Sequence, residues 1–139
     1  MEINKLTIEN AVLGDLPRII EFVVLWLESK GLELYSFALE TSVDEASTNI
    51  VKHAYGGKGG FFEITCVLEK GDIVITIQDH GPKFDPSTVP LPDIGADLEH
   101  RKIGGLGLYM MRKMMDSVEF VYEEGVGNKL VMRKETGIK

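Results

Sequence analysis

The chain of 139 residues is poor in cysteine, in long apolar runs and in positive charge, and each scarcity excludes a class of protein. Its one cysteine, Cys66, excludes a disulfide within the chain and fits a reducing cytoplasm. The longest apolar run, residues 22–27, is far too short to span a membrane. The formal net charge of −7 argues against broad nucleic-acid binding, because neutralising phosphates requires a basic surface. We therefore expect a cytoplasmic protein that binds neither nucleic acid directly nor a membrane.

The rest of the composition, with 44% apolar and 27% charged residues, is ordinary for a globular protein. The length suits one domain, which we expect to cover residues 1–139. Alternation of apolar and polar residues predicts strands over residues 2–9, 61–69, 72–78, 117–124 and 128–134. Lys70-Gly71, between the second and third of these, predicts a hairpin. Apolar residues at helical spacing predict helices over residues 16–30, 34–54 and 106–115. This order predicts an α+β fold, a two-layer α/β sandwich with helices on one face of a mixed β-sheet.

Residues 80–103 show no periodic apolar pattern and contain four of the five prolines. A loop of about twenty residues is uncommon in a compact domain unless it is functional or mobile. The segments on either side of this loop, and the helix predicted over 34–54, carry the candidate functional residues.

On that helix, Glu45 and Asn49 are one turn apart, and His53 lies one turn further on the same face. A carboxylate and an amide oxygen so placed can address a Mg²⁺ ion and its waters, because Mg²⁺ prefers oxygen ligands. The plain alternative is a solvated polar face, and for His53 a polar residue at a helix end.

Asp79 directly follows the strand predicted over 72–78, and Gly81 follows it in an Asp-x-Gly sequence. A carboxylate at a strand end can accept a hydrogen bond from an exocyclic amine, the group that separates adenine from guanine. Gly81 permits a positive φ and a close approach of the backbone. An ordinary Asp-x-Gly turn is the plain alternative.

The sequence Gly104-Gly105-Leu106-Gly107 precedes the helix predicted over 106–115. Unpaired amides at a helix N-terminus form an anion site, and glycines let a phosphate approach. The spacing matches neither a Walker loop nor a Rossmann fingerprint, which disfavours both folds. Lys102 and its neighbour Arg101 can approach phosphates, or can equally be solvated loop charges.

In this order, residues 45–53, 79–86 and 104–108 resemble the N box and the two glycine boxes of the GHKL ATPase superfamily. The compact length and the Glu-x-x-x-Asn-x-x-x-His pattern of 45–53 are similar to the anti-sigma-factor serine kinases of bacterial partner-switching systems. The resemblance covers nearly the whole chain and implies the Bergerat-type ATP-binding fold.

The resemblance also implies roles for single residues. Glu45 would act as general base and Asn49 would bind the Mg²⁺ that bridges the phosphates of ATP. Asp79 would read the adenine amine, and Gly81 would let the base pack closely. Gly105 and Gly107 would hold the phosphates below a lid of residues 86–103. The further nucleotide contacts expected are His53, Phe84, Lys102, Gly104, Leu106 and Leu108.

Two positions depart from the family pattern. Lys83 stands where the first glycine box often has a second glycine, which leaves the shape of that turn open. Asn128 follows Gly127 where many relatives have threonine, so a hydroxyl often found near the nucleotide is absent.

The function implied is a serine/threonine-protein kinase that transfers phosphate from Mg·ATP to a small anti-sigma-factor antagonist. The resemblance adds a sigma factor as a further expected partner and a homodimer as the expected assembly. Two alternatives stay open: a non-kinase ATP- or ADP-binding switch that acts by complex formation, and the detached catalytic domain of a histidine kinase.

Overall fold

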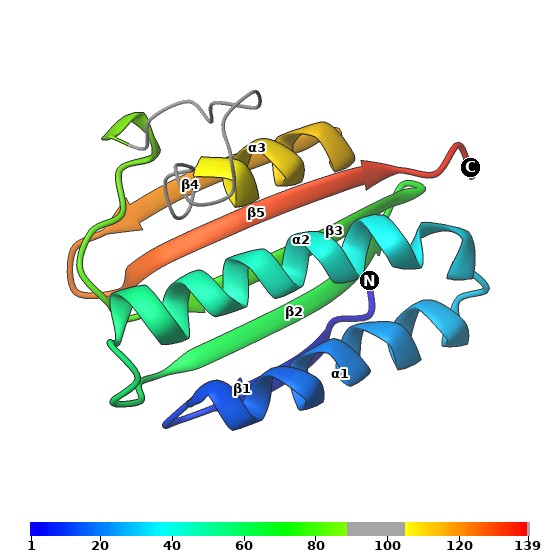
Figure 1. Ribbon diagram of the computed structural model, residues 1–139. Coiled ribbons are helices and arrows are strands. Elements are labelled where there is room, and N and C mark those ends of the chain that lie inside the picture. The colour runs from blue at the N-terminus through cyan, green and yellow to red at the C-terminus, as the bar shows by residue number, and fades with distance from the viewer. Residues whose placement is uncertain (89–104, 139) are drawn as a thin grey trace.

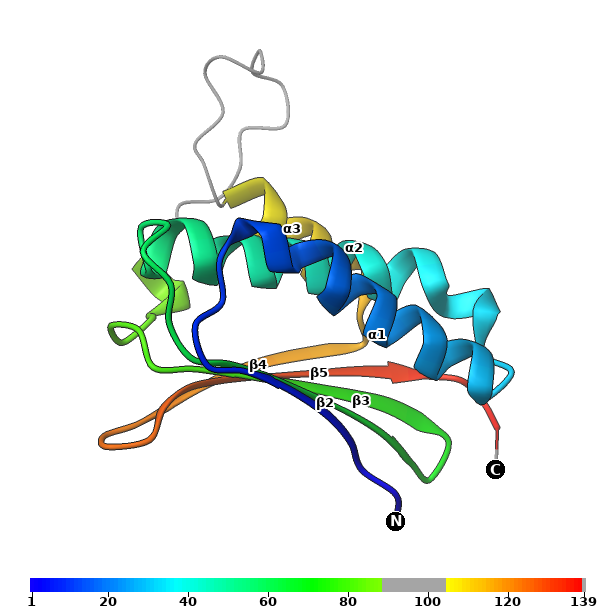
Figure 2. The ribbon, with the colours of Figure 1, turned by 90° about the horizontal axis from the view of Figure 1, so that it is seen from below.

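A layer of helices covers one face of a five-stranded β-sheet in the computed structural model (Figure 1). The structure describes residues 1–88 and 105–138. The strands are β1 (Asn4–Ile8), β2 (Phe62–Glu69), β3 (Asp72–Asp79), β4 (Ser117–Glu123) and β5 (Gly127–Glu135). The main helices are α1 (Leu16–Ser29), α2 (Ser36–Thr48) and α3 (Gly105–Met114). Figure 2 shows all of these helices on the same side of the sheet, so the predicted two-layer α/β sandwich is confirmed.

The sheet order is β1-β2-β3-β5-β4, and every neighbouring pair is antiparallel. The expectation of a mixed sheet is therefore wrong for the described strands. After β3 the chain returns through α3, and β4 then runs in the same direction as β3. However, β5 lies between these two strands and is antiparallel to both, because the tight turn after β4 reverses the chain. No parallel pair results.

The turn between β2 and β3 confirms the hairpin that Lys70-Gly71 predicts. Both residues have positive φ, 51° for Lys70 and 85° for Gly71, the pattern of a two-residue turn that matches the twist of its strands. The hairpin aligns eight residue pairs, from Glu69 opposite Asp72 to Phe62 opposite Asp79. This register fixes Asp79 at the far end of the ladder from the turn.

The core lies between the helix layer and the sheet. Period-two alternation along the strands turns one set of side chains toward the helices, and in β3 these are Ile73, Ile75 and Ile77. Cys66 is fully buried among them, as its apolar strand predicts, and burial raises the pKa of its thiol to about 12. In the described part of the chain, no helix is long and apolar enough to cross a membrane.

The second predicted helix changes type before it ends. It begins with the 3-10 turn η2 (Glu33–Tyr35), continues as α2, and closes as the π-helix η3 (Asn49–Ala54). The Tyr55 N–H donates to the Ile50 carbonyl five residues earlier at 2.9 Å, the hydrogen bond that defines this wider turn. Single π-helical turns occur frequently at functional sites. Here the π-helix carries both Asn49 and His53.

Candidate functional site

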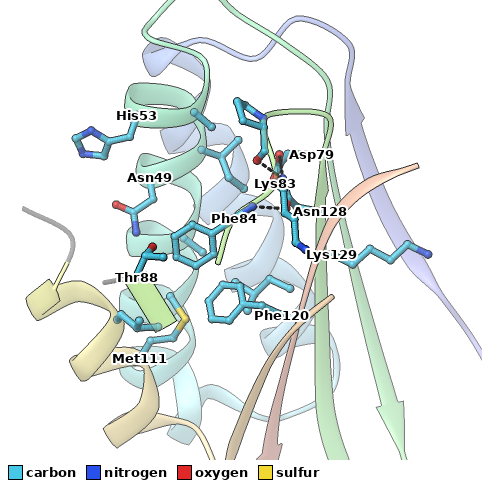
Figure 3. Close-up of a pocket in the computed structure, with 16 residues that line it drawn as sticks. Asn49, His53, Asp79, Lys83, Phe84, Thr88, Met111, Phe120, Asn128 and Lys129 are labelled. Carbon is cyan, nitrogen blue, oxygen red and sulfur yellow. Dashed lines mark hydrogen bonds between the residues drawn. The ribbon is translucent and has the colours of Figure 1, made fainter. Parts of the chain in front are cut away.

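A cavity of about 600 Å³ opens between the helix layer and the end of the sheet where β3 finishes and β5 begins (Figure 3). Small-molecule sites have volumes of about 300–1,000 Å³ and mostly apolar walls with a few polar groups. The described residues that line it are Ala46, Asn49, Ile50, His53, Ala54, Asp79, Pro82, Lys83, Phe84, Thr88, Leu108, Met111, Phe120, Asn128, Lys129 and Leu130.

This cavity brings together five of the residues singled out in the sequence. Asn49 and His53 come from η3, Asp79 from the end of β3, Phe84 from the following loop, and Leu108 from α3. Asn49 and His53 project from the same helical segment, and the imidazole of His53 points away from Asp79 (Figure 3). His53 is thus at the margin of the cavity rather than beside the buried carboxylate.

Asp79 is the buried charged group of the cavity, with a side chain only 6% exposed. Its Oδ1 accepts hydrogen bonds from the Gly81 N–H at 2.8 Å and from the Asn128 amide at 3.0 Å. Both hydrogen bonds that described residues donate to this carboxylate end on Oδ1. Asp79 nevertheless lines the cavity, and a buried carboxylate needs partners for its second oxygen as well. The arrangement suits a ligand that brings a hydrogen-bond donor.

Gly81 shows a close approach without the positive φ that the sequence allowed for. A Cβ on Gly81 would lie 3.0 Å from the Cβ of Ala54 and 3.1 Å from Oδ1 of Asp79. The loop therefore approaches the end of η3 closely at Gly81, while the close packing of a base against this glycine stays a prediction. The positive φ that glycine permits is not adopted here.

Tyr55 was not among the sequence candidates, yet its hydroxyl joins three segments next to Asp79. It donates to the Phe61 carbonyl at 2.5 Å and accepts from the His80 N–H at 2.8 Å. Burial raises the pKa of this phenol, and the charge of Asp79 raises it further, while the His80 hydrogen bond lowers it. Tyr55 therefore stays a neutral donor. Nothing in its local sequence distinguishes it from a surface tyrosine.

Glu45 lies on α2, one turn before Asn49, and faces α3. A Cβ on Gly107 would collide with the Glu45 carboxylate, so the glycine leaves room for this carboxylate in its present position. Burial raises the pKa of Glu45, and the neighbouring charge of Asp44 raises it further. The structure thus places the second glycine segment against the carboxylate of the first helix motif. Ser42, three residues before Glu45 on α2, is a polar residue that is fully buried.

The remaining candidates fall partly outside the described residues. Lys102, Gly104 and the lid expected over 86–103 lie outside them, except that residues 86–88 form the short helix η4. For Gly105 and Leu106 the backbone is described, and α3 begins at Gly105 as the glycine-rich helix start predicts. The anion site expected at this helix N-terminus stays a prediction.

The cavity walls are mostly apolar. The rings of Phe84 and Phe120 are 4.9 Å apart at an angle of 51°, and Met111, only 2% exposed, packs from α3. Phe120 and Met111 have sequence patterns typical of core packing, so their patterns do not mark them as cavity residues. Lys83 at the rim lies 5.8 Å from the centre of the Tyr122 ring. An apolar cavity with one buried carboxylate suits a heterocyclic base that carries an amine.

A sequence profile described as "Histidine kinase-like ATPase domain" matches residues 10–134. The chain belongs to the histidine kinase-like ATPase family. A solved structure of the catalytic domain of the histidine kinase ThkA, in a nucleotide-free form, has the same fold. Its TM-score is 0.54, the identity is 14%, and the match covers 97% of each chain.

Several curated relatives of this ATPase-family chain carry names that concern kinases and sigma factors. The serine-protein kinase RsbW of Listeria monocytogenes is 37% identical over 101 residues, which are 69% of this chain and 63% of that protein. The anti-sigma F factor of Clostridium acetobutylicum is 32% identical over 100 residues, 70% of this chain and 68% of that protein. The RsbW kinase of Bacillus cereus is 35% identical over 92 residues. The matched region is less than two thirds of either RsbW protein, at 63% and 58%.

Proposed function

We propose that this chain is an ATP-dependent serine/threonine-protein kinase of the anti-sigma-factor type. It would phosphorylate a small antagonist protein in a partner-switching system. The observation that carries the proposal is the joint placement of two carboxylates. Asp79 is buried in an apolar cavity, and Glu45, with a raised pKa, lies one helical turn from Asn49 and against Gly107. The names of the RsbW and anti-sigma F relatives support the choice of substrate class.

The cavity residues fit an adenine nucleotide. Apolar side chains supply the walls for the base, and Asp79 supplies the acceptor for its exocyclic amine. The close contact of Gly81 with Ala54 leaves no room for a side chain at the edge of the cavity. The net charge of −7 means that the phosphates need local partners, which the amides at the start of α3 and the lysines near the cavity would provide.

A magnesium ion fits only if the phosphates share in holding it. Among the described residues, no group of three or more His, Cys, Asp or Glu side chains could hold a metal ion. Mg²⁺ is commonly bound through one or two protein oxygens together with phosphates and waters. In this proposal the side-chain oxygen of Asn49 is the protein ligand, and the ion would neutralise phosphate charge during transfer.

Glu45 is the proposed general base. Burial raises the pKa of Glu45, which makes its carboxylate a stronger base than that of a solvated glutamate. It would orient the serine or threonine hydroxyl of the partner and accept its proton. ATP supplies the phosphoryl group that the hydroxyl receives. Asn49 and the glycines of α3 would hold the phosphates in place, which is most of what such a transfer requires.

The partners follow from the relatives alone. An antagonist protein as substrate, a sigma factor as a second partner and a homodimer as the assembly are all parts of this proposal, as is the predicted cytoplasmic location. The experiment is to co-purify partners with the tagged protein, add labelled Mg·ATP, and identify the phosphorylated residue by mass spectrometry. We expect phosphoserine or phosphothreonine on a small partner protein.

The same experiment separates the alternatives. A phosphohistidine on a partner helix would favour the detached catalytic domain of a histidine kinase. A partner that binds and leaves as ATP is exchanged for ADP, with no protein phosphorylated, would favour a passive nucleotide switch. Either result would contradict the serine/threonine kinase.

A further inference from the structure

Asn128 holds the end of the sheet and the loop after Asp79 together with a single side chain. The residue is the second of β5, lies directly opposite Asp79 in the ladder, and is only 8% exposed. Its Nδ2 donates to Oδ1 of Asp79 at 3.0 Å, to the Pro82 carbonyl at 2.9 Å and to the Gly81 carbonyl at 3.3 Å. Its Oδ1 accepts the Phe84 N–H at 2.9 Å. The short dashed lines in Figure 3 mark contacts of this group.

These contacts use the hydrogen-bonding capacity of the Asn128 amide almost completely. A primary amide has two N–H donors and a carbonyl acceptor, and here both of its ends are bound to the protein. Asn128 lines the cavity but has little left to offer a ligand. By contrast, a threonine hydroxyl that donated to Asp79 would still have an acceptor lone pair for a ligand. The residue therefore acts on a ligand through Asp79.

The effect on Asp79 is to separate its two oxygens. Oδ1 receives the Gly81 N–H and the Asn128 amide, which fixes the rotation of the carboxylate about its last bond. Within residues 1–88 and 105–138 no group donates to Oδ2, so this oxygen is available to a ligand. Gly127 keeps the two strands close enough for this contact, because a Cβ there would overlap the Asp79 carbonyl. Its φ of +114° also favours glycine.

We propose that Asn128 is a positioning residue that sets the base preference of the nucleotide site. By binding Oδ1, it orients Asp79 so that Oδ2 alone reads the exocyclic amine of the base. The inference rests on the proposed nucleotide site and deepens it. If Asn128 were purely structural, replacing it would lower stability and weaken the binding of all nucleotides alike. If it positions Asp79, replacing it changes the ratio of the affinities for nucleotides with different bases.

The test uses a matched pair of variants, Asn128→Thr and Asn128→Val. The two side chains have the same shape and suit a strand, but only threonine can donate to Oδ1 of Asp79. Binding is measured by calorimetry for Mg·ATP and for the Mg·triphosphate of purine riboside, whose base lacks the 6-amino group. A thermal melt of each variant shows that it is folded.

We expect the wild type and Asn128→Thr to share a preference for ATP, and Asn128→Val to lose most of it. The ratio of the affinity for ATP to that for the purine riboside triphosphate should fall on the order of tenfold, which corresponds to the loss of one hydrogen bond to a charged group. A folded Asn128→Val with the wild-type ratio would overturn the positioning role while leaving the nucleotide site intact. If the valine variant does not fold, the pair Asn128→Ser and Asn128→Ala decides in the same way. A wild type that binds neither compound would overturn the proposed function and this inference with it.

Discussion

Helix α2 lies between two halves of the α/β sandwich, and the space between helices and sheet is filled in one half and open in the other. On the side of α1, the space above β1 and β2 is filled by apolar side chains, among them the fully buried Ile19, Val23 and Leu27. On the side of α3, the space above the start of β5 holds a cavity of about 600 Å³ and two buried polar residues, Asp79 and Asn128. The filled half stabilises the fold, and the open half holds groups that folding alone does not require.

The open half has the features of a functional site. Burying a carboxylate costs free energy unless its oxygens are hydrogen-bonded, and the protein satisfies only one oxygen of Asp79 from described residues. Likewise Glu45 has a raised pKa, so its ionised form is disfavoured where it lies. Such costs are typical of binding and catalytic sites, where stability is given up for chemistry.

The largest expected effect is on phosphoryl transfer in the open half. Glu45→Gln keeps size and a carbonyl oxygen but loses the base, so transfer to the partner should fall by roughly 10²–10⁴-fold. Binding of Mg·ATP should survive. Asn49→Ala should differ by weakening Mg²⁺-dependent binding itself. Rates from labelled ATP and affinities from calorimetry check both, and a wild-type transfer rate in Glu45→Gln would show that Glu45 is no base.

The next largest effect is on stability, and it should differ between the filled half and the open half. Leu27→Ala in the filled half removes fully buried atoms and leaves a cavity, which costs about 2–5 kcal/mol of unfolding free energy. The nucleotide affinity of the folded fraction should not change. Leu108→Ala at the cavity wall should cost less unfolding free energy, because the Leu108 side chain already borders open space. The same variant should weaken the binding of ATP. Urea unfolding and calorimetry measure the two. If Leu27→Ala and Leu108→Ala lost equal unfolding free energy and equal affinity for ATP, the two halves would not differ in function.

A smaller effect concerns Asp79. Asp79→Asn replaces one acceptor oxygen by a donor, so ATP binding should weaken on the order of tenfold, the cost of one charge-assisted hydrogen bond. The matched control is Gln78→Glu on the preceding residue, which alternation places on the opposite face of the sheet and whose amide donates to the Val126 carbonyl. Affinities for ATP that fall equally in both variants would contradict a local role for Asp79.

The smallest effect is a gain in stability from Glu45→Gln. A carboxyl whose pKa is raised on folding destabilises the folded state when it is ionised, at pH values above that pKa. Removing the charge should therefore raise Tm near neutral pH, on the order of one or two degrees for this partly exposed group. The gain should shrink as the pH falls through the raised pKa of Glu45. Differential scanning calorimetry at several pH values checks it, and a clear loss of Tm would contradict the sign.

The sequence predicted the elements well because their signals are local. Alternation and helical spacing gave every strand and main helix to within a few residues, and Lys70-Gly71 gave the hairpin. The direction of strand pairing was missed, because insertion of β5 between β3 and β4 depends on contacts far apart in the chain.

The sequence indicated those candidate residues that one motif keeps together, such as Glu45 and Asn49, and their roles stay predictions. The supporting residues were not indicated in this way. Asn128 is 49 positions from Asp79, and its hydrogen bonds exist only after the sheet has formed. Two signals were present: Asn128 stands where many relatives have a threonine often found near the nucleotide, and it is in phase with the inward-facing Leu130 and Met132. Tyr55 offered none, since its partners Phe61 and His80 are backbone groups of other segments.

The proposed function depends on selective binding of the adenine of ATP in the cavity beside Asp79. Calorimetric titration of the wild type with Mg·ATP and with Mg·GTP, under the same conditions, tests it most directly. We expect ATP to bind at least about tenfold more tightly than GTP, because guanine presents an oxygen to the Asp79 carboxylate where adenine presents an amine. Equal affinities for the two nucleotides would contradict it.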